Sequence, residues 1–213
     1  DSVNTIAAQL IERTGPEAVI ATARRCGIQS PLRPVYSLAL GTSGVSPLEM
    51  ASAFATFATG GIRHEPFWIL RVEDTQGRIL EEHLVSGQRV LEPDLSYQIV
   101  DMMRGVLDRG SGAVVRRLGF TLPAAGKTGT TNSFKDAWFT GFTPNLSTSV
   151  WIGYDQGQGM RDRQGRGITG GRGHQPLRAG WRVHQPTPAI PGKRGLPAQL
   201  ESGRPHSPLQ QQG

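Results

Sequence analysis

The chain has 213 residues and a formal net charge of +6, a length that suits one domain with a substantial core and is short for two. Residues 1–155 hold 14 Lys or Arg against 15 Asp or Glu, whereas residues 156–213 hold 9 against 2, so the first part has no charge-based reason to bind an anionic partner. Cys26 is the only cysteine, which excludes an intrachain disulfide and a thiolate metal cluster.

The first 61 residues predict three helices. Apolar residues recur at helical spacing over residues 6–11, and Pro16 marks the start of a second helix that Cys26 and Gly27 would close. The clearest helix start is Ser-Pro-Leu-Glu at residues 46–49, because a serine followed three residues later by glutamate is a capping box and proline suits the first helical position. Two glycines at 60–61 end this third helix.

The rest of the first 155 residues predicts one more helix and two groups of strands. A hairpin is expected over residues 67–82, where apolar and polar residues alternate around a Gln-Gly turn. A helix follows over residues 93–107, and three extended runs over residues 122–130, 137–142 and 148–154 form an antiparallel meander. Helices ahead of consecutive strands indicate an α/β or α+β domain with a mainly antiparallel sheet.

Residues 156–213 are predicted to be a disordered tail, with a domain boundary near Tyr154. Twelve glycines and seven prolines make up about a third of this segment, a level typical of disorder. Its Arg-Gly pairs are compatible with nonspecific phosphate binding, but Trp181 is its only aromatic residue, so a bland extension is favoured and no specific nucleic-acid partner is expected. The sequence has neither a signal peptide nor an apolar run of about 18 residues, so we expect no leader or anchor within it.

Two chemistries compete for residues 125–132, Ala-Gly-Lys-Thr-Gly-Thr-Thr-Asn. A phosphate-binding Walker loop needs a glycine five residues before Gly126, and that position is Thr121. The other interpretation places the Lys-Thr-Gly of residues 127–129 on an edge strand that lines a cleft, where glycine lets a substrate backbone approach and hydroxyls hold a carboxylate. For a bare three-residue match, an ordinary strand with an exposed lysine is the default.

The extent of the match decides between these interpretations. The informative segments are LGTSGVSPLEM at residues 40–50, RGSG at 109–112, KTGTTN at 127–132, DAWFTGFTP at 136–144 and VWIGY at 150–154. In these segments, and in their order and spacing, roughly residues 1–155 resemble the class A, bifunctional penicillin-binding proteins. Several specific segments in the right order are hard to obtain by accident.

That family has three active-site motifs: Ser-x-x-Lys, which carries the nucleophile, then Ser-x-Asn and Lys-Thr-Gly. Residues 2–4, Ser-Val-Asn, match the second motif, although Ser-x-Asn by itself is a weak pattern that more often marks a helix cap. No Ser-x-x-Lys occurs in the 213 residues. The resemblance therefore implies a transpeptidase domain of the β-lactamase and penicillin-binding fold that is incomplete at its N-terminus and lacks the nucleophile.

The resemblance implies a D-Ala-D-Ala transpeptidase that cross-links peptidoglycan through an acyl-serine. Ser2 would relay a proton toward the leaving amine, and Asn4 would hold the lysine of the absent motif and a substrate amide. Lys127 would supply positive charge beside Ser2, which eases proton transfer and attracts the substrate carboxylate.

Three substrate-binding residues are implied as well. Thr128 and Thr130 would hydrogen-bond the substrate carboxylate, and Gly129 would let the substrate backbone approach closely. The Thr130 amide would be one of two oxyanion donors, and the second belongs to the absent serine; loss of one such donor costs about 2.7–4 kcal/mol. We therefore expect no turnover from residues 1–213 alone.

The resemblance also implies the surroundings of the protein. Its partners would be D-Ala-D-Ala stem peptides and β-lactam antibiotics, with no cofactor and no metal, and the parent would be anchored in the bacterial plasma membrane with this domain on the extracytoplasmic, periplasmic side. The alternative from another class is a noncatalytic remnant or binding module with a basic tail.

Overall fold

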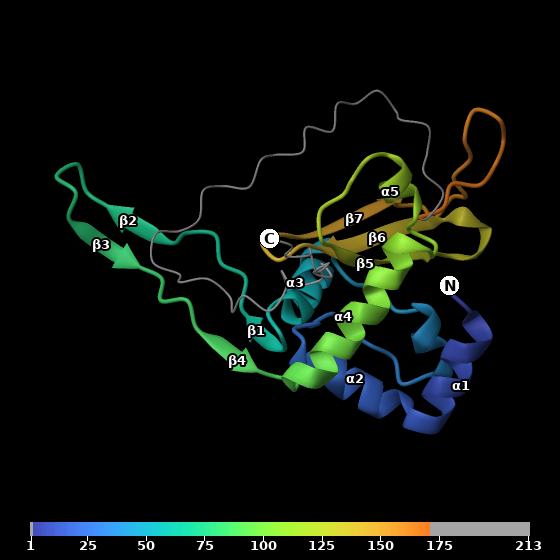
Figure 1. Cartoon of the computed structure of the whole chain (residues 1–213), viewed down its shortest axis with the longest axis horizontal. Helices are drawn as coiled ribbons and strands as arrows, with labels where there is room; N and C mark the ends of the chain where they lie inside the picture. Colours follow the sequence, from blue (N-terminus) through green and yellow to red (C-terminus); the bar gives the residue numbers. More distant parts are fainter. Residues whose placement is uncertain (1, 171–213) are drawn as a thin grey trace, which may run out of the picture. The chain divides into compact units, whose positions relative to one another are not determined.

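The computed structural model describes residues 2–170, in which helices precede a three-stranded antiparallel sheet (Figure 1). The α-helices and 3₁₀ helices (η) are α1 (Asn4–Thr14), α2 (Pro16–Arg25), η1 (Tyr36–Leu40), α3 (Pro47–Ala58), α4 (Pro93–Asp108), α5 (Val114–Arg117) and η2 (Asn132–Phe134). The strands are β1 (Ile62–His64), β2 (Arg71–Glu73), β3 (Ile79–Glu82), β4 (Gly87–Arg89), β5 (Ala125–Thr130), β6 (Asp136–Phe142) and β7 (Ser147–Gly153). The predicted α/β class with a mainly antiparallel sheet is confirmed.

The two N-terminal helices form where the apolar spacing predicted them. Gly15, with φ of 84°, separates α1 from α2, and Pro16 occupies the first turn of α2, where its missing N–H costs nothing. Ile11 of α1 is 2% exposed, and Cys26 and Ile28, which follow α2, belong to the main buried cluster. Ile11 therefore anchors α1 in the interior, while Ser2 and Val3 ahead of the helix are exposed.

Helix α3 begins with the predicted capping box. The Ser46 side chain accepts a hydrogen bond from the Glu49 backbone N–H at 3.2 Å, and the Glu49 carboxylate accepts one from the Ser46 N–H at 2.9 Å. The same carboxylate accepts the backbone N–H groups of Gln29 and Ser30, each at 2.6 Å, and the Ser30 hydroxyl at 2.5 Å. One side chain thus joins the segment after α2 to the start of α3.

Glu49→Gln is expected to make the protein less stable at neutral pH and to change little in acid. Burial raises the pKa of Glu49, but hydrogen bonds from Ser30, Ser46 and Gln29 outweigh it and lower the pKa from 4.5 to about 2. Because the folded pKa is the lower one, this stabilisation is complete above pH 4.5 and is lost as the pH falls toward 2. An amide nitrogen cannot accept these bonds, so we expect Glu49→Gln to lower the free energy of unfolding at neutral pH by about 1–2 kcal/mol. The value is modest because nearby water screens the carboxylate.

Urea unfolding at pH 7 and at pH 2.5 measures this difference. Glu12→Gln, on the exposed surface of α1, is the matched control and should leave the unfolding midpoint unchanged. A Glu49→Gln deficit of equal size at both pH values would contradict the assigned role of the carboxylate.

The sheet places β5 at one edge, with β6 in the centre and β7 beyond it. Helix α4 contacts β5, and α3 contacts β6 and β7 (Figure 1). Gly126 allows close pairing, because a Cβ there would lie 2.9 Å from the Thr140 carbonyl oxygen. Within residues 2–170, β6 is the only strand that pairs with β5, so β5 is an edge strand of the described sheet.

Two further ribbons lie between α3 and α4 in the chain. β2 pairs with β3, which confirms the predicted hairpin with shorter strands, and β1 pairs with β4 in a second ribbon that the sequence did not predict (Figure 1). Trp68, just ahead of β2, is 81% exposed. Within residues 2–170, no helix is both long and apolar enough to cross a bilayer.

The first part of the predicted tail contacts the turn between β5 and β6. Met160 is 4% exposed, its N–H donates to the Phe134 carbonyl at 2.8 Å, and its own carbonyl accepts the Ile168 N–H at 3.1 Å. The boundary near Tyr154 stays a prediction, and the part of the tail beyond residue 170 lies outside the described residues.

Candidate active site

Ser2 and Lys127, which are 125 positions apart, meet at strand β5. The Lys127 Nζ donates to the Ser2 Oγ at 3.0 Å. Ser2 lies two residues ahead of Asn4, the first residue of α1, and Lys127 is the third residue of β5. The structure therefore brings together one residue from each of the two predicted motifs, and the catalytic roles of the pair stay predictions.

The environment of Lys127 changes how readily its ammonium group releases a proton. Nζ also donates to the Thr128 carbonyl at 2.7 Å, and burial lowers the pKa of Lys127 below its ordinary value of 10.5. Desolvation disfavours the charged form of a lysine, so the proton is held less firmly than in water. A lysine of this kind, bonded to a serine hydroxyl, can pass a proton along the pair and can attract an anion.

Thr128 hydrogen-bonds a residue outside the predicted motifs. Its side chain is buried, and its Oγ1 lies 2.6 Å from the Oγ of Ser111. Ser111 follows α4, the helix that contacts β5. The predicted carboxylate-binding role of Thr128 is untested by this geometry, which shows how its hydroxyl is held.

Thr130 is exposed at the end of β5, and its Oγ1 accepts a hydrogen bond from the Gly170 N–H at 3.0 Å. Gly129 lies against Trp138, where an added Cβ would be 3.2 Å from the Trp138 Cβ. Asn4 is exposed at the first position of α1, on the same short segment as Ser2. Five of the six predicted residues therefore lie on two elements, the start of α1 and β5, and the sixth is Ser2 just ahead of α1.

Two residues that hold the predicted hydroxyls were not identified from the sequence. Ser111 lies in the RGSG segment, which supported only the resemblance, and Gly170 lies in the segment predicted as tail. A serine between two glycines directly after a helix was the available signal for Ser111. Within residues 2–170, no group of three or more His, Cys, Asp or Glu side chains is arranged to hold a metal ion.

Residues 1–170 match the family of the penicillin binding protein transpeptidase domain. The chain belongs to this family. Among relatives, penicillin-binding protein 1A of Aquifex aeolicus is 38% identical over 179 residues, which are 83% of this chain and 23% of the relative. Penicillin-binding protein 1A of Neisseria gonorrhoeae is 35% identical over 208 residues, which are 95% of this chain and 25% of the relative.

Solved structures show the same likeness. Penicillin-binding protein 1A from Haemophilus influenzae superposes with a TM-score of 0.71 at 26% identity, covering 80% of this chain and 31% of that chain. The PonA1 protein from Mycobacterium tuberculosis, solved in complex with penicillin V, superposes with a TM-score of 0.67 at 29% identity, covering 78% and 49%. The chain spans about a quarter of the length of the Aquifex aeolicus and Neisseria gonorrhoeae relatives. It corresponds to a C-terminal transpeptidase fragment of them.

Proposed function

We propose that residues 1–213 supply the carboxylate-binding half of a D-Ala-D-Ala transpeptidase active site, in an enzyme that cross-links peptidoglycan through an acyl-serine. The observation that carries the proposal is the 3.0 Å bond between Lys127 Nζ and Ser2 Oγ, because it joins the two motif residues beside an edge strand in a chain of this family. The nucleophile belongs to a Ser-x-x-Lys segment, which these residues do not contain.

In the complete reaction, the serine oxygen of that segment attacks the penultimate D-Ala carbonyl and forms an ester, while the bond to the terminal D-Ala nitrogen breaks. Ser2 donates its hydroxyl proton to the leaving nitrogen and takes up the proton that the attacking serine loses to the lysine of its own Ser-x-x-Lys segment, while the positive charge of Lys127 eases the transfer. The Thr130 N–H stabilises the oxyanion as one of two donors. An amine of a second stem peptide then attacks the ester, releases the serine and closes the cross-link.

Substrate binding uses charges and hydroxyls that residues 1–213 contain. Lys127 attracts the terminal carboxylate of the substrate, Thr128 and Thr130 donate hydrogen bonds to it, and Asn4 holds a substrate amide. β-Lactams with a carboxylate occupy the same positions. The parent enzyme acts on the extracytoplasmic face of the bacterial plasma membrane, where its stem-peptide substrates are exposed.

A gel assay with fluorescent penicillin tests whether residues 1–213 contain the carboxylate site without the nucleophile. Residues 1–213 alone should show no covalent label after denaturation, because the carboxylate site is present and the nucleophile is not. A label that survives denaturation would mean that a serine of this chain is acylated. It would overturn the proposal that the nucleophile lies outside residues 1–213.

Calorimetric titration tests the carboxylate site itself. Residues 1–213 should bind diacetyl-L-Lys-D-Ala-D-Ala more tightly than its C-terminal amide, since only the acid offers an anion to Lys127. Equal affinity for the acid and the amide would contradict the proposed function.

A further inference from the structure

The hydroxyl of Ser111 directly contacts a residue of the proposed carboxylate site. Its Oγ lies 2.6 Å from Thr128 Oγ1, and Thr128 as a whole is only 8% exposed. A short bond between two part-buried hydroxyls fixes the rotation of both, since little water competes for either oxygen. The proposed mechanism gives Ser111 no role.

The loop around Ser111 is built to hold one conformation. The Gly112 N–H donates to the Val106 carbonyl at 3.0 Å, and the Ala113 N–H donates to the Gly110 carbonyl at 3.1 Å. A Cβ on Gly110 would lie 2.9 Å from the Val106 Cα, so the backbone approaches the end of α4 more closely than a side chain permits. Ser111 therefore lies in a closely packed, hydrogen-bonded turn.

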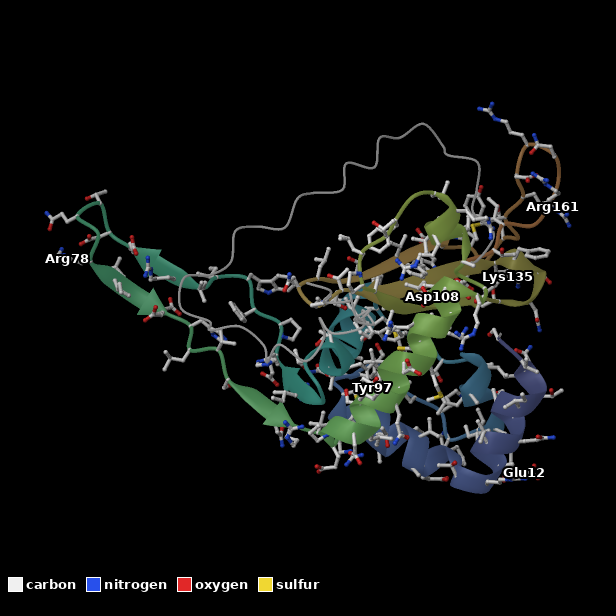
Figure 2. All side chains as sticks on the ribbon, viewed as in Figure 1. Glu12, Arg78, Tyr97, Asp108, Lys135 and Arg161 are labelled. Carbon is white, nitrogen blue, oxygen red and sulfur yellow. The ribbon has the colours of Figure 1, made fainter. Side chains whose placement is uncertain are left out.

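Arg116 fixes the other end of this loop. Its Nε donates to the Asp108 carboxylate at 3.0 Å, and its Nη1 donates to the carbonyls of Phe120 and Leu122 at 3.0 and 2.8 Å. Asp108 is the last residue of α4 and is labelled in Figure 2, and residues 120–122 lead into β5. Arg116 thus joins the end of α4, which precedes Ser111, to the segment that precedes β5, which carries Thr128.

The direction of the hydroxyl bond follows from the charge of the ligand. A hydroxyl has one proton, and an ionised carboxylate only accepts hydrogen bonds. If Thr128 donates to the substrate carboxylate, it can only accept from Ser111. The Thr130 hydroxyl also accepts a hydrogen bond, from the Gly170 backbone N–H at 3.0 Å. The direction of this bond is certain, because a backbone N–H can only donate.

We propose that Ser111 is a positioning residue that commits the Thr128 hydroxyl to donate toward the substrate, and so sets the preference of the site for a terminal carboxylate over an amide. The proposal rests on the proposed function and goes beyond it, because it assigns a specificity role to a residue outside the three motifs. Without Ser111, the Thr128 hydroxyl is free to rotate and can serve an amide donor as an acceptor.

The test compares the affinities of residues 1–213 for diacetyl-L-Lys-D-Ala-D-Ala and for its C-terminal amide. Ser111→Ala should reduce the acid-to-amide affinity ratio about fivefold, the value of one neutral hydrogen bond. Ser111→Thr keeps the hydroxyl and should restore the ratio, while Ser111→Cys keeps the shape with a weaker donor and should give an intermediate ratio.

Two further variants separate positioning from a merely structural role. Thr128→Val should lower the ratio, and adding Ser111→Ala to it should lower the ratio no further, because the two hydroxyls act as one unit. Ser147→Ala is the matched control, since that hydroxyl donates to the Ala51 carbonyl at 2.7 Å and joins β7 to α3. It should lower the melting temperature and leave the ratio unchanged.

The outcomes distinguish the two proposals. A wild-type chain that does not prefer the acid contradicts the proposed function. A wild-type chain that prefers the acid, with an unchanged ratio in Ser111→Ala and Ser111→Cys, overturns the role of Ser111 and leaves the proposed function standing. A fall in both affinities at a constant ratio likewise means that Ser111 is only structural.

Discussion

Lys127→Met is expected to weaken binding of diacetyl-L-Lys-D-Ala-D-Ala to residues 1–213 by about 10- to 100-fold, the range for loss of a charge-assisted hydrogen bond. Methionine keeps a long apolar stem and removes only the charge and the donors, including the 3.0 Å bond to Ser2. Affinity for the C-terminal amide should change little, because that ligand has no anion for Lys127 to attract. Calorimetric titration of the wild-type chain and of Lys127→Met gives the ratio of their affinities for the acid and for the amide.

The affinity for diacetyl-L-Lys-D-Ala-D-Ala should change with pH as Lys127 loses its proton. Burial lowers the pKa of Lys127 from 10.5, and the cation is the form that binds the carboxylate. Affinity should therefore be full below that lowered pKa and should fall as the pH rises through it, earlier than for an ordinary lysine. Lys127→Met should show no such fall.

Lys135→Met is the matched control for Lys127→Met. Lys135 is exposed at the turn between β5 and β6, where Figure 2 labels it, and it is the other lysine of the described residues. Its loss should leave the affinity within about twofold, because exposed charges contribute little. An equally large loss from Lys135→Met would mean that the general positive charge of the chain, and not the Lys127 site, attracts the ligand.

Leu107→Ala is expected to lower the free energy of unfolding by about 2–5 kcal/mol, the cost of a cavity in a packed interior. Leu107 is 2% exposed on α4, and a Cβ on Gly112 would lie 2.9 Å from its Cδ2, so the cavity would open beneath the loop that presents Ser111. Urea unfolding followed by circular dichroism measures the change.

Leu118→Ala, the same substitution at a leucine that is 75% exposed after α5, is the control. It should shift the free energy of unfolding by no more than about 0.5 kcal/mol. Similar losses for the two variants would show that the interior between α4 and β5 is not packed as described.

The elements that local sequence signals define were predicted correctly. The capping box of α3 involves residues three positions apart, and the β5 to β7 meander joins strands through short turns, so the residues that form them are close along the chain. Helix α5 was missed because it has only four residues and follows the tight turn at Gly110 and Gly112 rather than an apolar repeat of its own. The β1–β4 ribbon was missed because its strands flank the predicted hairpin and have no alternating pattern.

The sequence by itself indicated the starts of α1 to α4, the β2–β3 hairpin, the β5 to β7 meander and the family, and it proposed six candidate site residues, because each of these depends on residue type and on spacing over a few positions. Only the tertiary structure decided that Lys127 reaches Ser2, that Ser111 holds Thr128, and that Gly170 holds Thr130. These contacts join residues 125, 17 and 40 positions apart. Such contacts form only after helices and strands pack, and packing depends on the shapes of side chains from the whole domain, which no local pattern encodes.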